Sequence, residues 1–411
     1  MVFFFLLLLI IRSSLDSFSN IGIFIRLMNF NIPSIVGILI LIGGVPYIFI
    51  KAKKNVFIKA KINAHKISAV FGLWLLILVP FIFISINNFG TKGFFAFREW
   101  IRLLTLFMIF LLSYQLSKKS NFQKFLNLPF LSLGLPLSVG IHQLITHGGL
   151  TIKGIHRIYG TIAHPNSFAL YIVLFIGLTY WKLRTTNRKL WGFLLLVELG
   201  VLIMTISFGG YIMFGILFLF LLLKQKIKQK IIIIFLMTLF LLIIFHIPSV
   251  QTKIEEIKSI NIIRTMEEKE VVDSFTWRIV NWYNLLSIWK ERPLLGYGLQ
   301  ATSIINPWKT PSEEIGYAPH NDFIRYLVET GIVGLTFYII FIVSIGYYLF
   351  RAYKVCKDSE IKSLLYIILG VFIAWQTGSL VDNFITSTTF QFYFWSYLGT
   401  TLKCSEFNLE K

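Results

Sequence analysis

Three short polar clusters, each beside a long apolar run, contain the residues of this chain that could do chemistry. The last of them reads Ala-Pro-His-Asn-Asp over residues 318–322 and directly precedes an apolar segment. Histidine exchanges protons near neutral pH, so His320 could act as a general base. A histidine at a helix start can equally be a capping or surface residue. Its position alone leaves both roles open.

The two other clusters are centred on arginine. Arg157 lies in the segment 156–166, which ends in Pro165-Asn166, and Arg278 lies in an aromatic segment followed by Arg292. A guanidinium is a planar fork of donors that matches phosphate oxygens, and such bonds strengthen near a membrane surface of low dielectric constant. Arg157 and Arg278 could therefore hold one diphosphate. The alternative is that these side chains only snorkel towards lipid headgroups.

The composition places these clusters in a membrane protein. Of the 411 residues, 56% are hydrophobic and 14% charged, whereas about one quarter of an ordinary soluble domain is charged. Apolar runs long enough for a membrane-spanning helix recur along the chain. We expect an all-α polytopic membrane protein with about a dozen transmembrane helices. They are predicted near residues 2–12, 33–50, 67–86, 99–117, 127–146, 165–181, 190–206, 208–223, 231–247, 331–350, 361–380 and 384–402.

The net charge of +20 indicates topology rather than a nucleic-acid partner, because the basic residues gather in alternate connectors between apolar runs. The basic connectors lie near residues 51–66, 118–124, 182–189, 224–230 and 351–362. The positive-inside rule then predicts that both termini are cytoplasmic. The first run, 2–12, lacks a basic region and a cleavage site of small residues, so we interpret it as a short span or signal anchor.

The same alternation divides the chain into three parts. We expect N-terminal transmembrane helices over 1–247, one large extracytoplasmic loop over 248–330, and C-terminal transmembrane helices over 331–411. Within the loop, the charged segment 252–271 and the aromatic segment 275–289 predict short interfacial helices, with tryptophans near headgroup depth.

The sequence contains no cofactor fingerprint. It has no P-loop or dinucleotide motif, and no spacing of acidic residues or histidines that predicts a metal site. Its two cysteines, Cys356 and Cys404, fall beside lysines in predicted cytoplasmic segments, so we expect reduced thiols. Polar residues in or near spans suggest function or pairing with a neighbouring helix; they are His142, Gln143, Glu198, Gln376 and Asp382.

The three clusters, in this order, resemble the O-antigen ligase and polymerase family of bacterial envelope glycan assembly, over about residues 130–400. That family has an arginine before a glycine and a small-Pro-Asn element. A large periplasmic loop follows, with an arginine, a Pro-x-x-Gly-x-Gly turn, and a His-Asn pair before Glu-x-Gly-x-x-Gly. The matching residues are Arg157, Gly160, Pro165, Asn166, Arg278, Pro293, Gly296, Gly298, His320, Asn321, Glu329, Gly331 and Gly334. Many members also have Ser-Arg-Gly in a middle span, where this chain has Ser207-Phe208-Gly209.

The resemblance implies a GT-C-like, metal-independent and cofactor-free glycosyltransferase of the bacterial inner membrane, with its active site on the outer face. Its donor would be a glycan linked to undecaprenyl diphosphate. His320, Arg278 and Arg157 would be catalytic, whereas Asn166, Asn321 and Arg292 would bind substrate. A flippase and a chain-length regulator of the same pathway are the expected protein partners, and no nucleic acid is expected.

Two reactions share this chemistry. The glycan can be added to another carrier-linked repeat unit, which is polymerisation, or to a lipid A core, which is ligation. We favour polymerisation, because polymerases are the more widespread users of the architecture. A flippase for the same lipid-linked sugar is a further alternative, but it would be expected to place polar residues at mid-membrane rather than in one outer loop.

Overall fold

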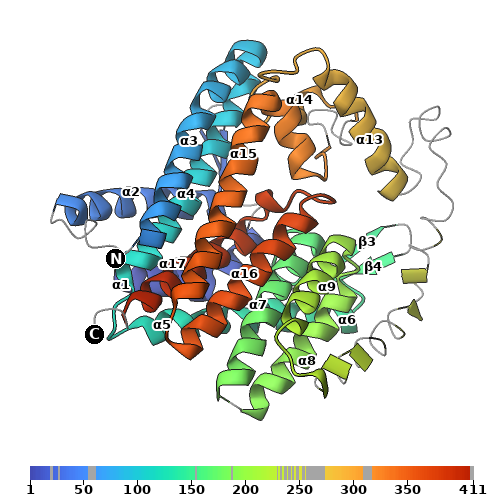
Figure 1. Cartoon of the computed structure of the whole chain (residues 1–411). Coiled ribbons are helices and arrows are strands. Elements are labelled where there is room, and N and C mark those ends of the chain that lie inside the picture. The colour runs from blue at the N-terminus through green and yellow to red at the C-terminus, as the bar shows by residue number, and fades with distance from the viewer. Residues whose placement is uncertain are drawn as a thin grey trace.

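The computed structural model describes residues 1–18, 22–25, 28–53, 62–152, 155–186, 188–228, scattered residues between 230 and 255, 274–308 and 317–407. Helices dominate these residues, and they pack side by side into a bundle (Figure 1). The described strands form two antiparallel hairpins, of β1 (Gly22–Ile25) with β2 (Met28–Asn31) and of β3 (Leu150–Ile152) with β4 (Ile155–Arg157). The prediction of an all-α polytopic protein is confirmed.

The helices follow the apolar runs of the sequence. In the N-terminal half the structure has α1 (Val2–Ile11), η1 (Arg12–Phe18), α2 (Ile32–Lys53), α3 (Ile62–Phe89), η2 (Gly90–Phe94), α4 (Phe95–Leu116), α5 (Phe122–Asn127), η3 (Leu128–Leu133), α6 (Gly134–Ile145), α7 (Pro165–Thr186), α8 (Lys189–Met204) and α9 (Phe208–Leu222). Later come α13 (Ser274–Trp289), α14 (Thr302–Ile305), α15 (Asp322–Val355), α16 (Ser359–Gly378), η4 (Phe384–Thr386) and α17 (Thr388–Glu406).

Among the described residues, six helical stretches are long and apolar enough to cross a membrane. One of these stretches contains both α3 and α4, and α9 is a shorter apolar helix. The protein is therefore a membrane protein, and large apolar side chains such as Leu76 and Phe83 lie exposed on its surface as lipid requires. The predicted span 231–247 lies mostly outside the described residues, and so does the charged segment 252–271, of which only Glu255 is described.

Two predicted spans have a different form in the structure. The first, α1, has 10 residues, a length of about 15 Å, which is half of what the hydrocarbon layer requires. It instead buries Phe5, Leu8 and Leu9 in the bundle. The span predicted at 127–146 falls in the stretch Phe122–Ile145, which is long and apolar enough to cross a membrane but consists of α5, the 3-10 turn η3 and the short helix α6.

The core of the bundle lies around α7 and α17, whose side chains are buried on nearly all sides. Aromatic rings fill the space between helices; for example, the Trp395 ring lies 4.7 Å from the Phe71 ring. This packing holds the N-terminal ends of α7 and α17 and the C-terminal end of α16 close to the start of α15 (Figure 1). The polar clusters of the sequence lie at these ends.

The Pro293–Gly298 turn fixes the start of α15 against α3. Gly298 N–H donates to the Glu329 carbonyl at 2.7 Å, and Leu299 N–H donates to the Phe81 carbonyl at 3.0 Å. Gly298 has φ +103°, and a Cβ there would lie 2.3 Å from the Ser85 nitrogen, so only glycine fits. This turn of the family motif thus has a structural task.

α15 is divided by a backbone break at Gly331, where φ is 64° and ψ is −170°. Its first part is tied down by buried ion pairs, in which Arg325 contacts Glu99 at 3.0 Å and Glu329 at 3.2 Å. The predicted boundary near residue 330 therefore coincides with a break within one helix whose first residue is Asp322. The short segment before the break carries the polar residues at its N-terminus.

Candidate active site

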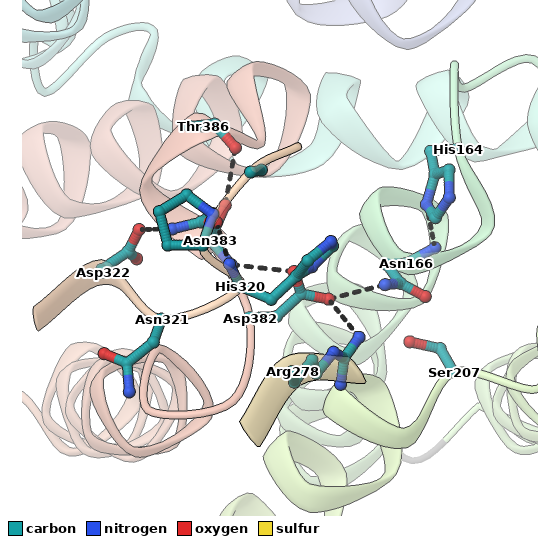
Figure 2. Close-up of polar contacts among 12 residues, drawn as sticks. His164, Asn166, Ser207, Arg278, His320, Asn321, Asp322, Asp382, Asn383 and Thr386 are labelled. Carbon is teal, nitrogen blue, oxygen red and sulfur yellow. Dashed lines mark hydrogen bonds and ion pairs between the residues drawn. The ribbon is translucent and has the colours of Figure 1, made fainter. Parts of the chain in front are cut away.

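Asp382, in the connection after α16, is the centre of the polar cluster (Figure 2). Its Oδ1 lies 2.7 Å from Nδ1 of His320. Its Oδ2 accepts a hydrogen bond from Asn166 Nδ2 at 2.6 Å and lies 3.9 Å from Arg278 Nη2. One buried carboxylate thus joins residues from α7, α13 and the segment before α15.

The environment keeps Asp382 charged. Burial alone would raise the pKa of this carboxyl, but the facing His320 and Arg278 hold it well below its usual range. A charged carboxylate accepts hydrogen bonds, so the proton between the two residues lies on Nδ1 of His320. Nε2 of a neutral His320 then carries the lone pair. This is the arrangement that a general base requires.

Arg157 lies at the end of β4, and some of its N–H donors already bond to other residues of the protein. Its Nε donates to the Thr205 carbonyl at 2.9 Å, and its Nη2 donates to Asn166 Oδ1 at 2.6 Å. Burial lowers the pKa of Arg157 to about 10, so the guanidinium stays protonated at neutral pH. Arg157 therefore orients Asn166, which in turn contacts Asp382, and adds a positive charge to the cluster.

Arg278 on α13 retains unused donor capacity. Its Nε is buried and has no hydrogen-bond partner among the described residues, and the same holds for Nε1 of the neighbouring Trp277. Buried donors without partners are rare and unfavourable. An anionic ligand beside Arg278 would satisfy them. The Trp277 ring also packs edge-on against His320, with ring centroids 5.5 Å apart.

The backbone around His320 is held in an uncommon conformation. His320 has φ 52°, in the left-handed region, and its N–H donates to Asn383 Oδ1 at 2.6 Å. Asn383 also donates to Asp322 at 3.1 Å. Left-handed residues other than glycine persist where their surroundings impose them, often at functional sites. Here the Asp382-Asn383 pair fixes both the ring and the main chain of His320.

The structure separates the six predicted site residues into two groups. His320, Arg278 and Asn166 meet around Asp382 (Figure 2). Arg157 joins them through its hydrogen bond to Asn166. Asn321 lies beside them, but its side chain caps α15 through Phe323 N and Ile324 N and donates to the Leu380 carbonyl.

Arg292 is not part of the cluster. It donates to Asn88 at 2.8 Å, and its guanidinium lies 4.9 Å from the centre of the Tyr297 ring. These contacts place Arg292 at the C-terminal end of α3, next to the Pro293–Gly298 turn.

The central residue, Asp382, is among the polar residues predicted near the ends of spans, but its position in the sequence indicated no role. The available signal was an Asp-Asn pair between two apolar runs, a costly position for a charge unless it has partners. Ser207, where the sequence departs from the family pattern, caps α9 by accepting from Gly210 N at 3.2 Å. Phe208 follows it, so the described cluster has no arginine from this position.

Comparisons with known proteins agree with the family that the motifs resemble. The O-antigen ligase family model matches residues 191–339, a segment that includes Arg278 and His320. A protein of Rickettsia conorii named "putative polysaccharide ligase" is 26% identical over 305 residues. That alignment covers 68% of this chain and 66% of the relative, so the chain spans about two thirds of the relative's length.

The contact between Asn166 and Asp382 predicts a pH-dependent instability in Asn166→Asp. Two carboxylates at this distance cannot both be charged, so one of them takes a raised pKa in the folded state. The variant should be about 1–3 kcal/mol less stable than the parent at pH 8. A group with a raised folded-state pKa binds its proton as the pH falls, so the deficit should shrink between pH 8 and pH 5.

The measurement is the thermal unfolding of purified protein in detergent across that pH range. Asn166→Ala is the control, because it removes the hydrogen bond to Asp382 without adding a charge. Its deficit should stay constant with pH. Parallel pH profiles for the two variants would contradict the geometry.

Proposed function

We propose that this chain is a member of the O-antigen ligase and polymerase family and that it transfers a glycan from a polyprenyl diphosphate carrier to an acceptor hydroxyl. The observation that carries the proposal is the His320–Asp382 pair facing Arg278 and Arg157. It combines a base oriented by a charged carboxylate with cations suited to a diphosphate. The proton acceptor, His320, and the proposed anion site at the two arginines therefore lie side by side.

The proposed reaction is a single displacement. The acceptor oxygen forms a bond with the anomeric carbon of the donor sugar, while the bond from that carbon to the diphosphate breaks. His320 Nε2 takes the proton of the acceptor hydroxyl, and the carrier diphosphate leaves with the bonding electron pair. Displacement from the opposite face inverts the anomeric centre.

Each residue of the cluster has a part in this scheme. Arg278, with its unpartnered Nε, binds the leaving diphosphate and stabilises the charge that develops on it. Arg157 adds a second positive charge and positions Asn166. Asp382 holds the Nδ1 proton of His320, so that Nε2 faces the reaction. The chemistry on these side chains needs neither a metal ion nor a cofactor.

The identity of the acceptor distinguishes ligation from polymerisation. The family description and the name of the relative both say ligase, so we propose ligase-type transfer to a sugar of a lipid-anchored acceptor. Polymerisation, which the sequence led us to favour, is the alternative and uses the same four residues. The product decides between them: a polymerase yields a ladder of increasing repeat number, whereas a ligase joins a finished chain to its acceptor once.

We further propose that the site faces outward from the bacterial inner membrane and that both termini are cytoplasmic. The support is the lysine-rich set of connectors on the opposite side. Trp308→Cys, in the large loop, should then react with a membrane-impermeant thiol reagent on intact cells. The native Cys356 and Cys404 are buried and provide the background signal. Labelling of Trp308→Cys only after cell lysis would reverse the orientation.

His320→Asn tests the proposed base more sharply than alanine does. Asparagine tolerates the left-handed conformation of residue 320, so the backbone is preserved, but it cannot accept a proton. Turnover should fall by about 10² to 10⁴ while binding of the carrier lipid persists. Full activity in His320→Asn would leave His320 with a structural role alone.

Arg278→Lys and Arg157→Lys should differ in their effects. Both keep the charge, but lysine lacks the planar fork that binds two phosphate oxygens. Arg278→Lys should lower turnover by about tenfold or more with unchanged thermal stability, because Nε of Arg278 has no hydrogen-bond partner among the described residues. Arg157→Lys should also lower the unfolding temperature, since Arg157 holds Thr205 and Asn166. Equal activity of Arg278→Lys and the parent would rule out the diphosphate contact.

A further inference from the structure

A second polar pocket lies on the other side of the turn that carries Asp382. Its volume is about 310 Å³, and it is formed mainly by α2, α4 and the start of α17. Arg12, Arg98 and Arg102 line it together with Gln300. The turn is shared, because Arg102 Nη1 donates to the Ile385 carbonyl at 2.7 Å while Ile385 N–H donates to Asp322 at 3.0 Å. The pocket and the Asp382 cluster are therefore separate sites with one common wall.

Positive charge exceeds negative charge at this pocket. Glu99 is the one carboxylate in its described lining. That carboxylate already forms ion pairs with Arg102 at 2.8 Å and with Arg325 at 3.0 Å. Arg12 is neutralised by Asp16 at 2.7 Å.

Arg98 has no ion-pair partner within the described part of the chain. It rests over the Phe95 ring, 5.4 Å from its centroid, and its side chain is exposed. The mouth of the pocket therefore offers an unpaired guanidinium.

The rest of the lining is mostly apolar, with Asn31, Ser34, Thr105 and Thr388 as its polar members. Val36 and Ile40 of α2 face Leu106 and Ile109 of α4 across the pocket, and Phe392 of α17 closes it. α2 itself is little covered by the protein, since 11% of its apolar window is buried. A ligand that entered here would have its polar part at the arginines and an apolar part along α2. That is the shape of an amphiphile with an anionic head.

We propose that this pocket binds a lipid phosphate, with its phosphate against Arg98 and Arg102 and the first part of its hydrocarbon chain between α2 and α4. The inference goes beyond the proposed transfer, whose diphosphate lies at Arg278 on the other side of the 382–388 turn. A transferase that joins two membrane-anchored substrates needs a place for each of them. A lipid-phosphate site behind the shared turn would hold the second one within reach of His320.

The test uses a cysteine in the pocket wall and measures its protection. Val36→Cys lies in the pocket, whereas Ile42→Cys on the same helix is exposed and outside it, which makes it the matched control. Both are placed in a His320→Asn background, so that no turnover is required, and in nanodiscs of phosphatidylcholine. The rate of maleimide labelling is then measured with farnesyl diphosphate, farnesol or inorganic diphosphate, and in nanodiscs that contain phosphatidylglycerol.

We expect farnesyl diphosphate to slow the labelling of Val36→Cys but not of Ile42→Cys, with farnesol and inorganic diphosphate ineffective at the same concentration. Arg98→Gln should raise the farnesyl diphosphate concentration needed for half protection by about tenfold. Equal protection by phosphatidylglycerol would identify a membrane phospholipid as the source of the phosphate, whereas protection by farnesyl diphosphate alone would identify an isoprenoid carrier.

Several results would overturn the inference. They are no protection by either lipid, equal protection of Ile42→Cys, protection by inorganic diphosphate alone, and protection that Arg98→Gln leaves unchanged. The exposed Arg98 makes no ion pair with the described residues, so the variant should keep its unfolding temperature. Because the measurement needs no catalysis, its failure is distinct from a failure of the proposed transfer, which the activity of His320→Asn tests.

Discussion

The charge of Asp382 is the interaction on which the arrangement of the site depends. A carboxylate removed from water is strongly unfavourable unless donors surround it. Here the donors are His320, Asn166 and the nearby Arg278, and they come from three separate parts of the chain. The requirement to satisfy one buried charge thus determines where the ends of α7, α13 and α15 meet. It also sets the tautomer of His320 on which the proposed chemistry relies.

A second buried network fixes the helices that support the site. Within a bilayer the hydrophobic effect does little to hold one helix against another, so close packing and polar contacts define the arrangement. Arg325 joins α4 and α15 through Glu99 and Glu329, and Thr302 donates to the same Glu329. The Pro293–Gly298 turn adds backbone hydrogen bonds to α3 and α15. Glu329 and these glycines of the family motif therefore support the site from outside it.

The 382–388 turn connects the two polar regions of the protein. On one side Asp382 and Asn383 fix His320. On the other side Arg102 binds the Ile385 carbonyl, and Arg12 contacts Thr388 at 3.1 Å. A ligand that changed the position of Arg102 would act on the same short turn that orients the base. Occupation of the α2–α4 pocket and the geometry of the His320–Asp382 pair are thereby physically linked.

The sequence by itself determined the fold class and most helix positions, because the length of an apolar run and the absence of charge follow from the thickness of the bilayer. The run predicted at 361–380 is α16, and the aromatic segment predicted at 275–289 is α13. Ordered motifs also identified His320, Arg278, Arg157 and Asn166, since each is a reactive or phosphate-binding residue type beside a span.

Only the tertiary structure decided how these residues act together. Asp382 is 62 positions from His320 and 216 from Asn166 along the chain, and no periodicity connects residues so far apart. The same limit explains Asn321 and Arg292, whose motif positions suggested substrate contacts. The Asn321 side chain caps α15, and Arg292 contacts Asn88 of α3 rather than the residues around Asp382. Which polar groups a side chain can reach depends on helix packing, and that packing results from contacts distributed over the whole chain.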